Sequence, residues 1–102
     1  MKYDVLFKEE ANLDVFEARN WYESRRIGLG EELLDEIEGC VNILKRDPQI
    51  YRIRKRNCRY CPLKRFPYVI VYEIFDRQVI VFAVFNTYQH PRRLDIRRGK
   101  LQ

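Results

Sequence analysis

Two apolar runs in the C-terminal half constrain the fold more than any other part of the chain. Residues 68–75 and 79–85 consist almost entirely of β-branched and aromatic side chains, and Asp76-Arg77-Gln78 separates them. Runs of this composition joined by a short polar turn are typical of a β-hairpin. Because the apolar character is nearly continuous, we expect the hairpin to lie in the centre of a sheet, with helices covering one face.

The N-terminal half predicts one short strand followed by two helices. Residues 3–8 predict the strand, and from about Asn12 apolar residues recur at helical spacing, with Asn12 or Asp14 as the N-cap. Gly28-Leu29-Gly30 ends this helix, and a second one runs to Asp47-Pro48. The short link predicts an antiparallel helical hairpin. The stripe expected to be buried on the second helix is Leu33, Ile37, Cys40 or Val41, and Leu44. The acidic residues expected to form a solvated face are Glu31, Glu32, Asp35, Glu36 and Glu38.

Between the helices and the hairpin the apolar period falls towards two. Residues 51–56 predict a strand with one basic face, and residues 58–65 predict another. The predicted order is β-α-α-β-β-β, an α+β fold in which the helical hairpin packs on one face of a mainly antiparallel four-stranded sheet. With 102 residues, we expect a single domain over residues 1–102, with a loosely ordered tail from about residue 92.

The two halves of the chain carry opposite charge. Residues 1–51 contain 7 basic and 12 acidic side chains, whereas residues 52–102 contain 13 basic and 3 acidic ones. This asymmetry indicates an acidic lobe and a basic surface suited to a polyanion or an acidic protein. A lopsided surface without a partner is the alternative interpretation.

The sequence argues against membrane, cofactor and metal functions. The longest apolar run, residues 79–85, is far shorter than the roughly 20 residues that span a bilayer. The first residues lack the apolar region of a secretory signal, so we expect a cytoplasmic protein without a membrane partner. Gly28-Leu29-Gly30 lacks the third glycine of a dinucleotide loop, and there is no Walker A motif. We therefore expect no cofactor and no small-molecule substrate.

The three cysteines, Cys40, Cys58 and Cys61, are an odd number without a secretory signal, so we expect free thiols rather than a disulfide framework. Cys58 and Cys61 are three residues apart on a predicted strand and would point to opposite faces. A tetrahedral zinc site needs four ligands, and only Cys40 and His90 could join that pair. We therefore expect no metal.

Basic residues interleaved with tyrosines in the later strands suit phosphate contact and base stacking. If this surface cleaved RNA, Tyr88 or His90 could transfer protons, and Arg59, Lys64 or Arg65 could stabilise the charge that develops on the phosphate. An ordinary loop histidine is the alternative interpretation of His90.

Several strings in this chain resemble the RelE/ParE toxin superfamily. They are Trp21-Tyr22-Glu23, then Gly28-Leu29-Gly30-Glu31-Glu32-Leu33-Leu34, then Pro48-Gln49-Ile50-Tyr51, then Leu63-Lys64-Arg65-Phe66-Pro67-Tyr68, and Ile80-Val81-Phe82-Ala83-Val84. The resemblance covers about residues 5–94. Its most specific part is the Arg-Phe-Pro-Tyr string followed by the hairpin.

The resemblance implies the toxin of a bacterial type II toxin–antitoxin pair, held inactive by a cognate acidic antitoxin that wraps it. Such an antitoxin could fold onto the basic sheet and place a helix in the groove beside residues 12–44. Its contacts, or those of the cellular target, would be Arg52, Arg54, Arg56, Arg59, Arg65, Arg92 and Arg93.

The superfamily divides by target. RelE-like members cleave messenger RNA on the ribosome, and ParE-like members inhibit DNA gyrase. Where many relatives have His-x-x-Arg-(Asp/Asn)-Pro after the last strand, this chain has Asn86-Thr87-Tyr88-Gln89-His90-Pro91. The loss of that histidine favours gyrase inhibition without catalysis. The alternatives are a ribosome-dependent endoribonuclease and a basic nucleic-acid-binding module without toxicity.

Overall fold

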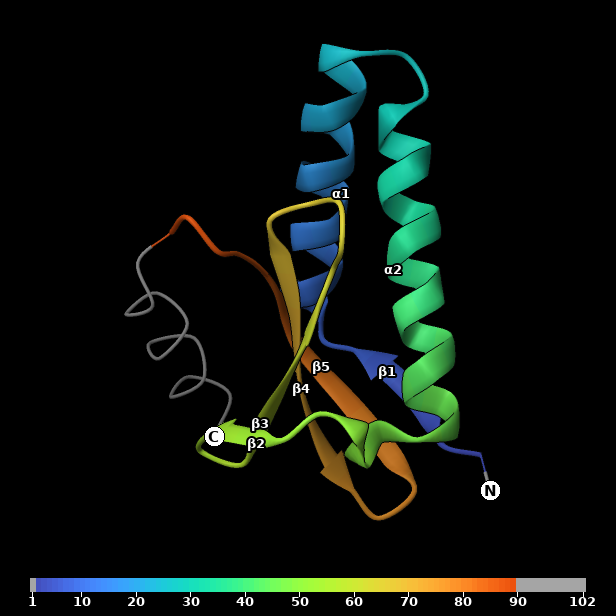
Figure 1. Cartoon of the computed structure of the whole chain (residues 1–102), viewed down its shortest axis with the longest axis vertical. Coiled ribbons are helices and arrows are strands. Elements are labelled where there is room, and N and C mark those ends of the chain that lie inside the picture. Colours follow the sequence, from blue (N-terminus) through green and yellow to red (C-terminus); the bar gives the residue numbers. More distant parts are fainter. Residues whose placement is uncertain (1, 90–102) are drawn as a thin grey trace.

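The computed structural model describes residues 2–89, in which two antiparallel helices pack against a five-stranded sheet (Figure 1). The elements are β1 (Asp4–Phe7), α1 (Glu9–Arg25), α2 (Leu29–Arg46), the short 3-10 helix η1 (Pro48–Ile50), β2 (Ile53–Lys55), β3 (Cys58–Pro62), β4 (Tyr68–Phe75) and β5 (Gln78–Asn86). The predicted α+β class and the helical hairpin on a mainly antiparallel sheet are confirmed. Within the described residues, neither helix is long and apolar enough to cross a membrane.

The predicted number of four strands is wrong, because the sheet has five in the order β1-β5-β4-β3-β2. β1 pairs in parallel with β5, and the other neighbours are antiparallel. Two short strands, β2 and β3, flank a turn at Arg56 and Asn57, which both adopt positive φ. β3 ends at Pro62 rather than Arg65, since residues 63–67 form the loop that leads into β4.

The β4–β5 hairpin is buried on both faces, as its composition predicts. Tyr72 and Val81 belong to the core cluster under the helices, whereas Val71 and Phe82 belong to a second cluster and are only 2% and 4% exposed. The register shifts between Val71 and Tyr72, so that Phe82 and Ala83 both join this second cluster. This bulge explains why the apolar run of β5 lacks a strict alternation.

The predicted buried stripe of α2 is confirmed, since Leu33, Ile37, Cys40 and Leu44 are all buried. The expected start of α1 is wrong, because the helix begins at Glu9 and its N-cap residue, Lys8, makes no side-chain cap. The acidic residues Glu9 and Glu10 in the first turn complement the positive end of the helix dipole instead.

The turn between the helices depends on two glycines and one carboxylate. Gly28 has a φ of +91°, a conformation that favours glycine. The Glu23 carboxylate accepts hydrogen bonds from the Gly28 and Gly30 N–H groups, at 2.9 Å each. These two donors hold the pKa of Glu23 below its usual value. At Gly30 a Cβ would lie 2.8 Å from the Arg19 carbonyl oxygen, so the helices approach closely only because this residue has no side chain.

Tyr72 joins the sheet to the end of the helical hairpin. Its side chain is fully buried, and its hydroxyl donates a hydrogen bond to the Pro48 carbonyl oxygen at 2.6 Å. Burial raises the pKa of the Tyr72 phenol well above its usual value, and the nearby Arg59 opposes this shift.

We expect Gly30→Ala to lower the free energy of unfolding by about 1–3 kcal/mol, because the new methyl group overlaps the Arg19 backbone. Gly39→Ala is the matched control on the same helix, since its Cβ would meet no atom within 4 Å. The control should be more stable by about 0.5–1 kcal/mol. Urea denaturation of both variants measures the difference, and equal effects would contradict the close packing at Gly30.

Alkaline pH should destabilise the protein through Tyr72. Below about pH 10 the phenol is neutral in both states, but above it the unfolded chain ionises while the buried Tyr72 does not, so unfolding becomes more favourable. Tyr72→Phe should cost about 1–3 kcal/mol at neutral pH, because the Pro48 carbonyl loses its donor. The same variant should show a shallower loss of stability in denaturation curves between pH 9 and 11.

Candidate functional site: the basic hairpin and the end of β5

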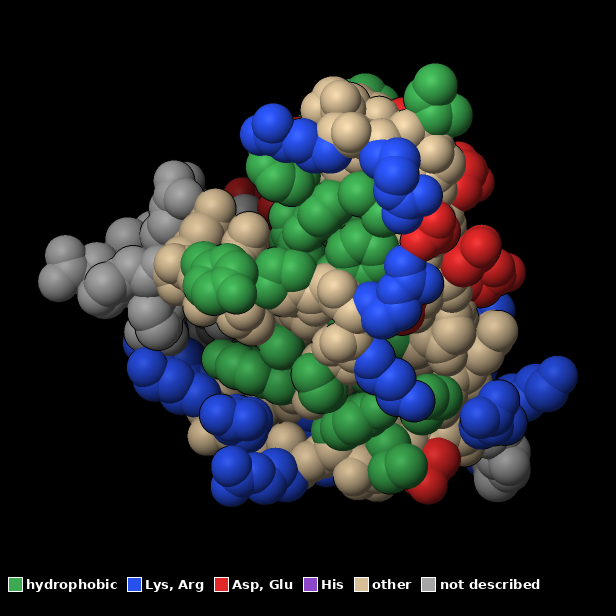
Figure 2. All heavy atoms as spheres, turned by 45° about the horizontal axis from the view of Figure 1, so that its top comes forward, with side chains coloured by type: hydrophobic (Ala, Val, Ile, Leu, Met, Phe, Trp, Pro, Cys, Tyr) green, Lys and Arg blue, Asp and Glu red, His purple; other side chains and the backbone are tan. Residues whose placement is uncertain are grey.

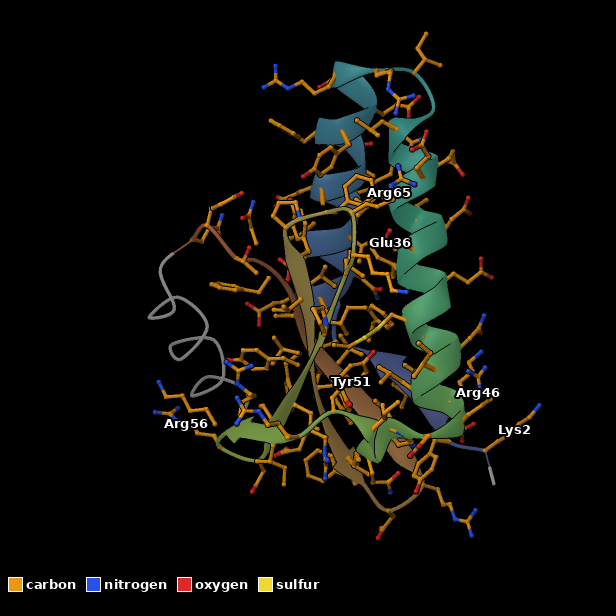
Figure 3. All side chains as sticks on the ribbon, in the orientation of Figure 1. Lys2, Glu36, Arg46, Tyr51, Arg56 and Arg65 are labelled. Carbon is orange, nitrogen blue, oxygen red and sulfur yellow. A yellow bond between two sulfur atoms is a disulfide. The ribbon has the colours of Figure 1, made fainter. Side chains whose placement is uncertain are left out.

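Four of the predicted basic residues gather at one edge of the sheet. Arg52, Arg54, Lys55 and Arg56, which we call the basic hairpin, are all exposed on or beside β2. Figure 2 shows Lys and Arg side chains grouped at this lower left end of the molecule, and Figure 3 places Arg56 at the end of the hairpin. The Arg54 guanidinium lies 5.1 Å from the centre of the Tyr60 ring, a cation–π contact that leaves its charge near the surface.

Arg59 is turned towards the protein rather than the solvent. Its Nη1 donates to the carbonyl oxygens of Tyr51, at 2.7 Å, and Gln49, at 3.3 Å. Gln49 belongs to η1, and Tyr51 follows it in the segment that leads to β2. In this structure the guanidinium therefore holds that connection against β3.

Arg65 lies in the β3–β4 loop, well separated from Arg56 in Figure 3. It forms an ion pair with Glu32 of α2, and Glu32 also pairs with Arg26 at 3.3 Å. The hydrogen bond from Arg65 is the main reason why the pKa of Glu32 lies below its usual value. Arg65 is thus paired within the protein, although its side chain remains largely exposed.

The neighbouring Glu36 holds the backbone of the same loop. Its carboxylate accepts hydrogen bonds from the N–H groups of Lys64, at 2.7 Å, and Arg65, at 3.0 Å. The expectation that the acids of α2 form only a solvated face is wrong for Glu32 and Glu36. Their four-residue spacing places them on one helix face, and the fold brings the loop against it.

The end of β5 holds Asn86, the position at which the family resemblance leads one to expect a histidine. The Asn86 Oδ1 accepts a hydrogen bond from the Tyr88 N–H at 2.8 Å, and Asn86 also hydrogen-bonds to the Tyr68 side chain. Burial is the main cause of a raised pKa for Tyr68. A small cavity of about 140 Å³ lies beside Asn86, and its lining includes the carboxylates of Asp14 and Glu17. The Asp14 carboxylate accepts a hydrogen bond from the Val84 N–H at 3.0 Å.

The residues considered for RNA cleavage are thus distributed over several elements. Arg59 lies on β3, Lys64 and Arg65 in the loop after it, and the exposed Tyr88 after β5. His90, Arg92 and Arg93 lie outside the described residues. Within residues 2–89, no group of three or more His, Cys, Asp or Glu side chains could hold a metal ion.

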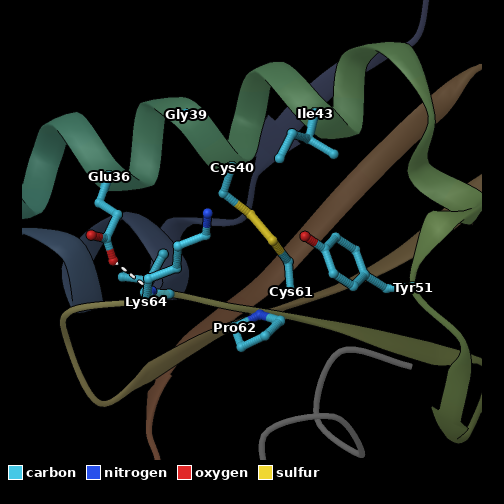
Figure 4. Close-up of a pocket in the computed structure, with 9 residues that line it drawn as sticks. Glu36, Gly39, Cys40, Ile43, Tyr51, Cys61, Pro62 and Lys64 are labelled. Atoms are coloured by element: carbon cyan, nitrogen blue, oxygen red, sulfur yellow. Dashed lines mark hydrogen bonds between the residues drawn. A yellow bond between two sulfur atoms is a disulfide. The ribbon is translucent and has the colours of Figure 1, made fainter.

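The expectation of free thiols is wrong for two of the three cysteines. Cys40 of α2 and Cys61 of β3 form a disulfide, because the buried stripe of the helix packs on the side of the strand to which Cys61 points. Cys58 is buried in the second cluster, so the prediction that Cys58 and Cys61 point to opposite faces is confirmed. The disulfide lines an open groove of about 240 Å³, which we call the α2–β3 groove (Figure 4). Its walls also include Ile43, Tyr51 and Lys64.

Sequence reasoning missed Glu36 and the cysteine pair. The helical spacing of Glu32 and Glu36 and the place of Cys40 on the apolar stripe were visible signals. Neither signal predicts which residue the side chain contacts. Lys64 and Arg65 come close to Glu36, and Cys61 to Cys40, only in the folded protein.

Comparison with known proteins is consistent with this architecture. A family model described as "ParE toxin of type II toxin-antitoxin system, parDE" matches residues 5–91. A chain of the solved structure "Chromosomal ParDE TA system from P. aeruginosa" superposes with a TM-score of 0.72 and 14% identity, over 83% of this chain and 96% of that one. At this identity the structural likeness shows a shared fold. No curated protein matches the sequence.

Glu36→Ala should loosen the β3–β4 loop, because two backbone N–H groups lose their acceptor. We expect a loss of about 1–2 kcal/mol in unfolding free energy and faster amide hydrogen exchange at Lys64 and Arg65. Glu38→Ala, on an exposed position of the same helix, is the control and should change neither quantity. Unchanged exchange in Glu36→Ala would show that the carboxylate does not hold the loop in solution.

Proposed function

The chain belongs to the ParE toxin family of type II toxin–antitoxin systems, and we propose that it arrests growth by binding DNA gyrase, without catalysis of its own. A cognate acidic antitoxin would neutralise it, and both proteins would act in the cytoplasm, where gyrase works. The observation that carries the proposal is the end of β5, where an asparagine stands in place of an acid–base residue.

The surroundings of Asn86 favour binding over RNA cleavage. An amide side chain does not exchange protons near neutral pH, and Asn86 is already engaged by the Tyr88 N–H. The carboxylates of Asp14 and Glu17 line the adjacent cavity and would repel a phosphate group. The two arginines considered for charge stabilisation, Arg59 and Arg65, are directed at protein oxygens.

The basic hairpin is the surface that we propose for macromolecular contact. Its four cations are exposed and fall within the five residues from 52 to 56. Together they produce a locally positive field. Such a field suits the acidic antitoxin in the inactive complex and an acidic surface of the target in the free toxin. Arg92 and Arg93 remain predicted contributors to this surface.

Purified toxin tests the proposal directly. It should inhibit supercoiling by gyrase while a coupled translation reaction with intact messenger RNA continues unchanged. Messenger cleavage on programmed ribosomes, lost in Tyr88→Phe or Arg65→Ala, would favour the endoribonuclease instead. Salt-sensitive binding to nucleic acid without growth arrest would favour a binding module without toxicity.

Charge reversal in the basic hairpin tests the contact surface. The double variant Arg54→Glu/Arg56→Glu should weaken gyrase inhibition at least tenfold, since two contacts of about 1 kcal/mol or more become repulsive. Lys45→Glu/Arg46→Glu has the same change in net charge in the last turn of α2 and should retain inhibition; Figure 3 shows Arg46 on the side of the molecule opposite Arg56. Equal losses in the two variants would assign the effect to net charge alone.

A further inference from the structure

The Cys40–Cys61 disulfide occupies an unusual position for a link between buried cysteines. The two residues are only 5% and 1% exposed, yet both line the open α2–β3 groove (Figure 4). The bond therefore lies beside the groove and joins α2 to β3 through two cysteines that are 21 residues apart in sequence. Because both residues are nearly fully buried, a reagent would reach the sulfur atoms when the groove opens locally, without global unfolding of the core.

The polar links between α2 and this part of the sheet are weaker than the disulfide. The hydrogen bonds from Lys64 and Arg65 to Glu36 and the ion pair of Arg65 with Glu32 lie near the surface. Contacts of this kind are individually worth about 1 kcal/mol or less. When the covalent link is broken, the helix and the β3–β4 loop are still held by these contacts and by the core cluster, which includes the loop residues Leu63 and Phe66 as well as the two cysteines.

We propose that Cys40 and Cys61 are a thiol–disulfide switch that controls how often the α2–β3 groove opens. Oxidised, the pair fixes β3 and the following loop to the helix. Reduced, the fold persists, because both side chains remain in the core cluster, but the loop opens more often. The switch itself does not depend on gyrase as the target. A redox effect on antitoxin or target binding would rest on the proposed function.

The chemistry is ordinary thiol–disulfide exchange. The thiolate of a protein or small-molecule dithiol attacks one sulfur of the pair, which forms a mixed disulfide and releases the other cysteine as a thiolate. The second thiol of the reductant then displaces the bound cysteine. Two electrons and two protons pass to Cys40 and Cys61, and the dithiol becomes a disulfide. Reaction with an oxidised disulfide such as oxidised glutathione reverses the change, and a reducing cytosol favours the dithiol form.

The chain contains its own control in Cys58, which is buried and belongs to the second cluster. Its sulfur neither lines the groove nor takes part in the disulfide. Cys58→Ser should therefore leave the switch intact, whereas Cys40→Ser and Cys61→Ser remove it.

The full chain is equilibrated with oxidised glutathione or dithiothreitol, and its disulfides are mapped by mass spectrometry without reduction. We expect a single link between Cys40 and Cys61 in the wild type and in Cys58→Ser, and a fall in Tm of roughly 10–20 °C on reduction. Amide exchange at Lys64 and Arg65 should accelerate at least tenfold in the reduced protein. In Cys40→Ser/Cys61→Ser, dithiothreitol should change neither quantity.

Three titratable thiols after treatment with oxidised glutathione would overturn the proposal, as would equal Tm and exchange rates in the two redox states. Both the thiol count and the comparison of the two redox states are measured on the wild-type protein. The test therefore works even if the double variant does not fold. Gyrase is absent from these measurements, and failure of the proposed function therefore leaves a different signature.

Discussion

The apolar contact between the β4–β5 hairpin and the two helices is the interaction on which the rest of the structure depends. Tyr72 and Val81 on the sheet and Leu33 on α2 are fully buried in one cluster. Once this layer forms, β1 can pair in parallel with β5, and the Tyr72 hydroxyl can reach the Pro48 carbonyl. That bond anchors the segment from which β2 and β3 extend to the opposite edge of the sheet. The position of the basic hairpin is thus a consequence of the core.

The opposite charges of the two halves serve the fold as well as binding. Part of the positive charge of the C-terminal half is balanced by α2, since Glu32 pairs with Arg65 and Glu36 binds the backbone beside it. Arg59 is directed at carbonyl oxygens. What remains exposed at the sheet edge is the basic hairpin, a smaller surface than the net charge of the sequence indicates. Its compactness makes it suited to a single acidic partner surface.

On the proposed function, the toxin would bind a neutralising antitoxin and a separate cellular target. The basic hairpin is the surface proposed for both contacts, and the α2–β3 groove lies on another part of the fold. The redox-active pair in the groove would add a third input, because the covalent link and the carboxylate contacts hold the same loop. Asn86, by contrast, accepts a hydrogen bond from the Tyr88 N–H at the end of β5.

The sequence by itself determined the central hairpin, the helical hairpin and the buried stripe of α2, because each follows from local periodicity. It also determined the family, because the resemblance rests on contiguous strings of residues. It also placed a strand in each of the five segments that form the sheet, but it did not determine that all five join one sheet, because the parallel pairing of β1 with β5 and the edge position of β2 depend on contacts between distant parts of the chain. Only the tertiary structure decided that Cys40 meets Cys61, that Glu36 binds the Lys64 and Arg65 backbone, and that Arg65 is separated from Arg56. These outcomes depend on which elements pack together, and the free energy of that packing comes from contacts between residues far apart in the chain.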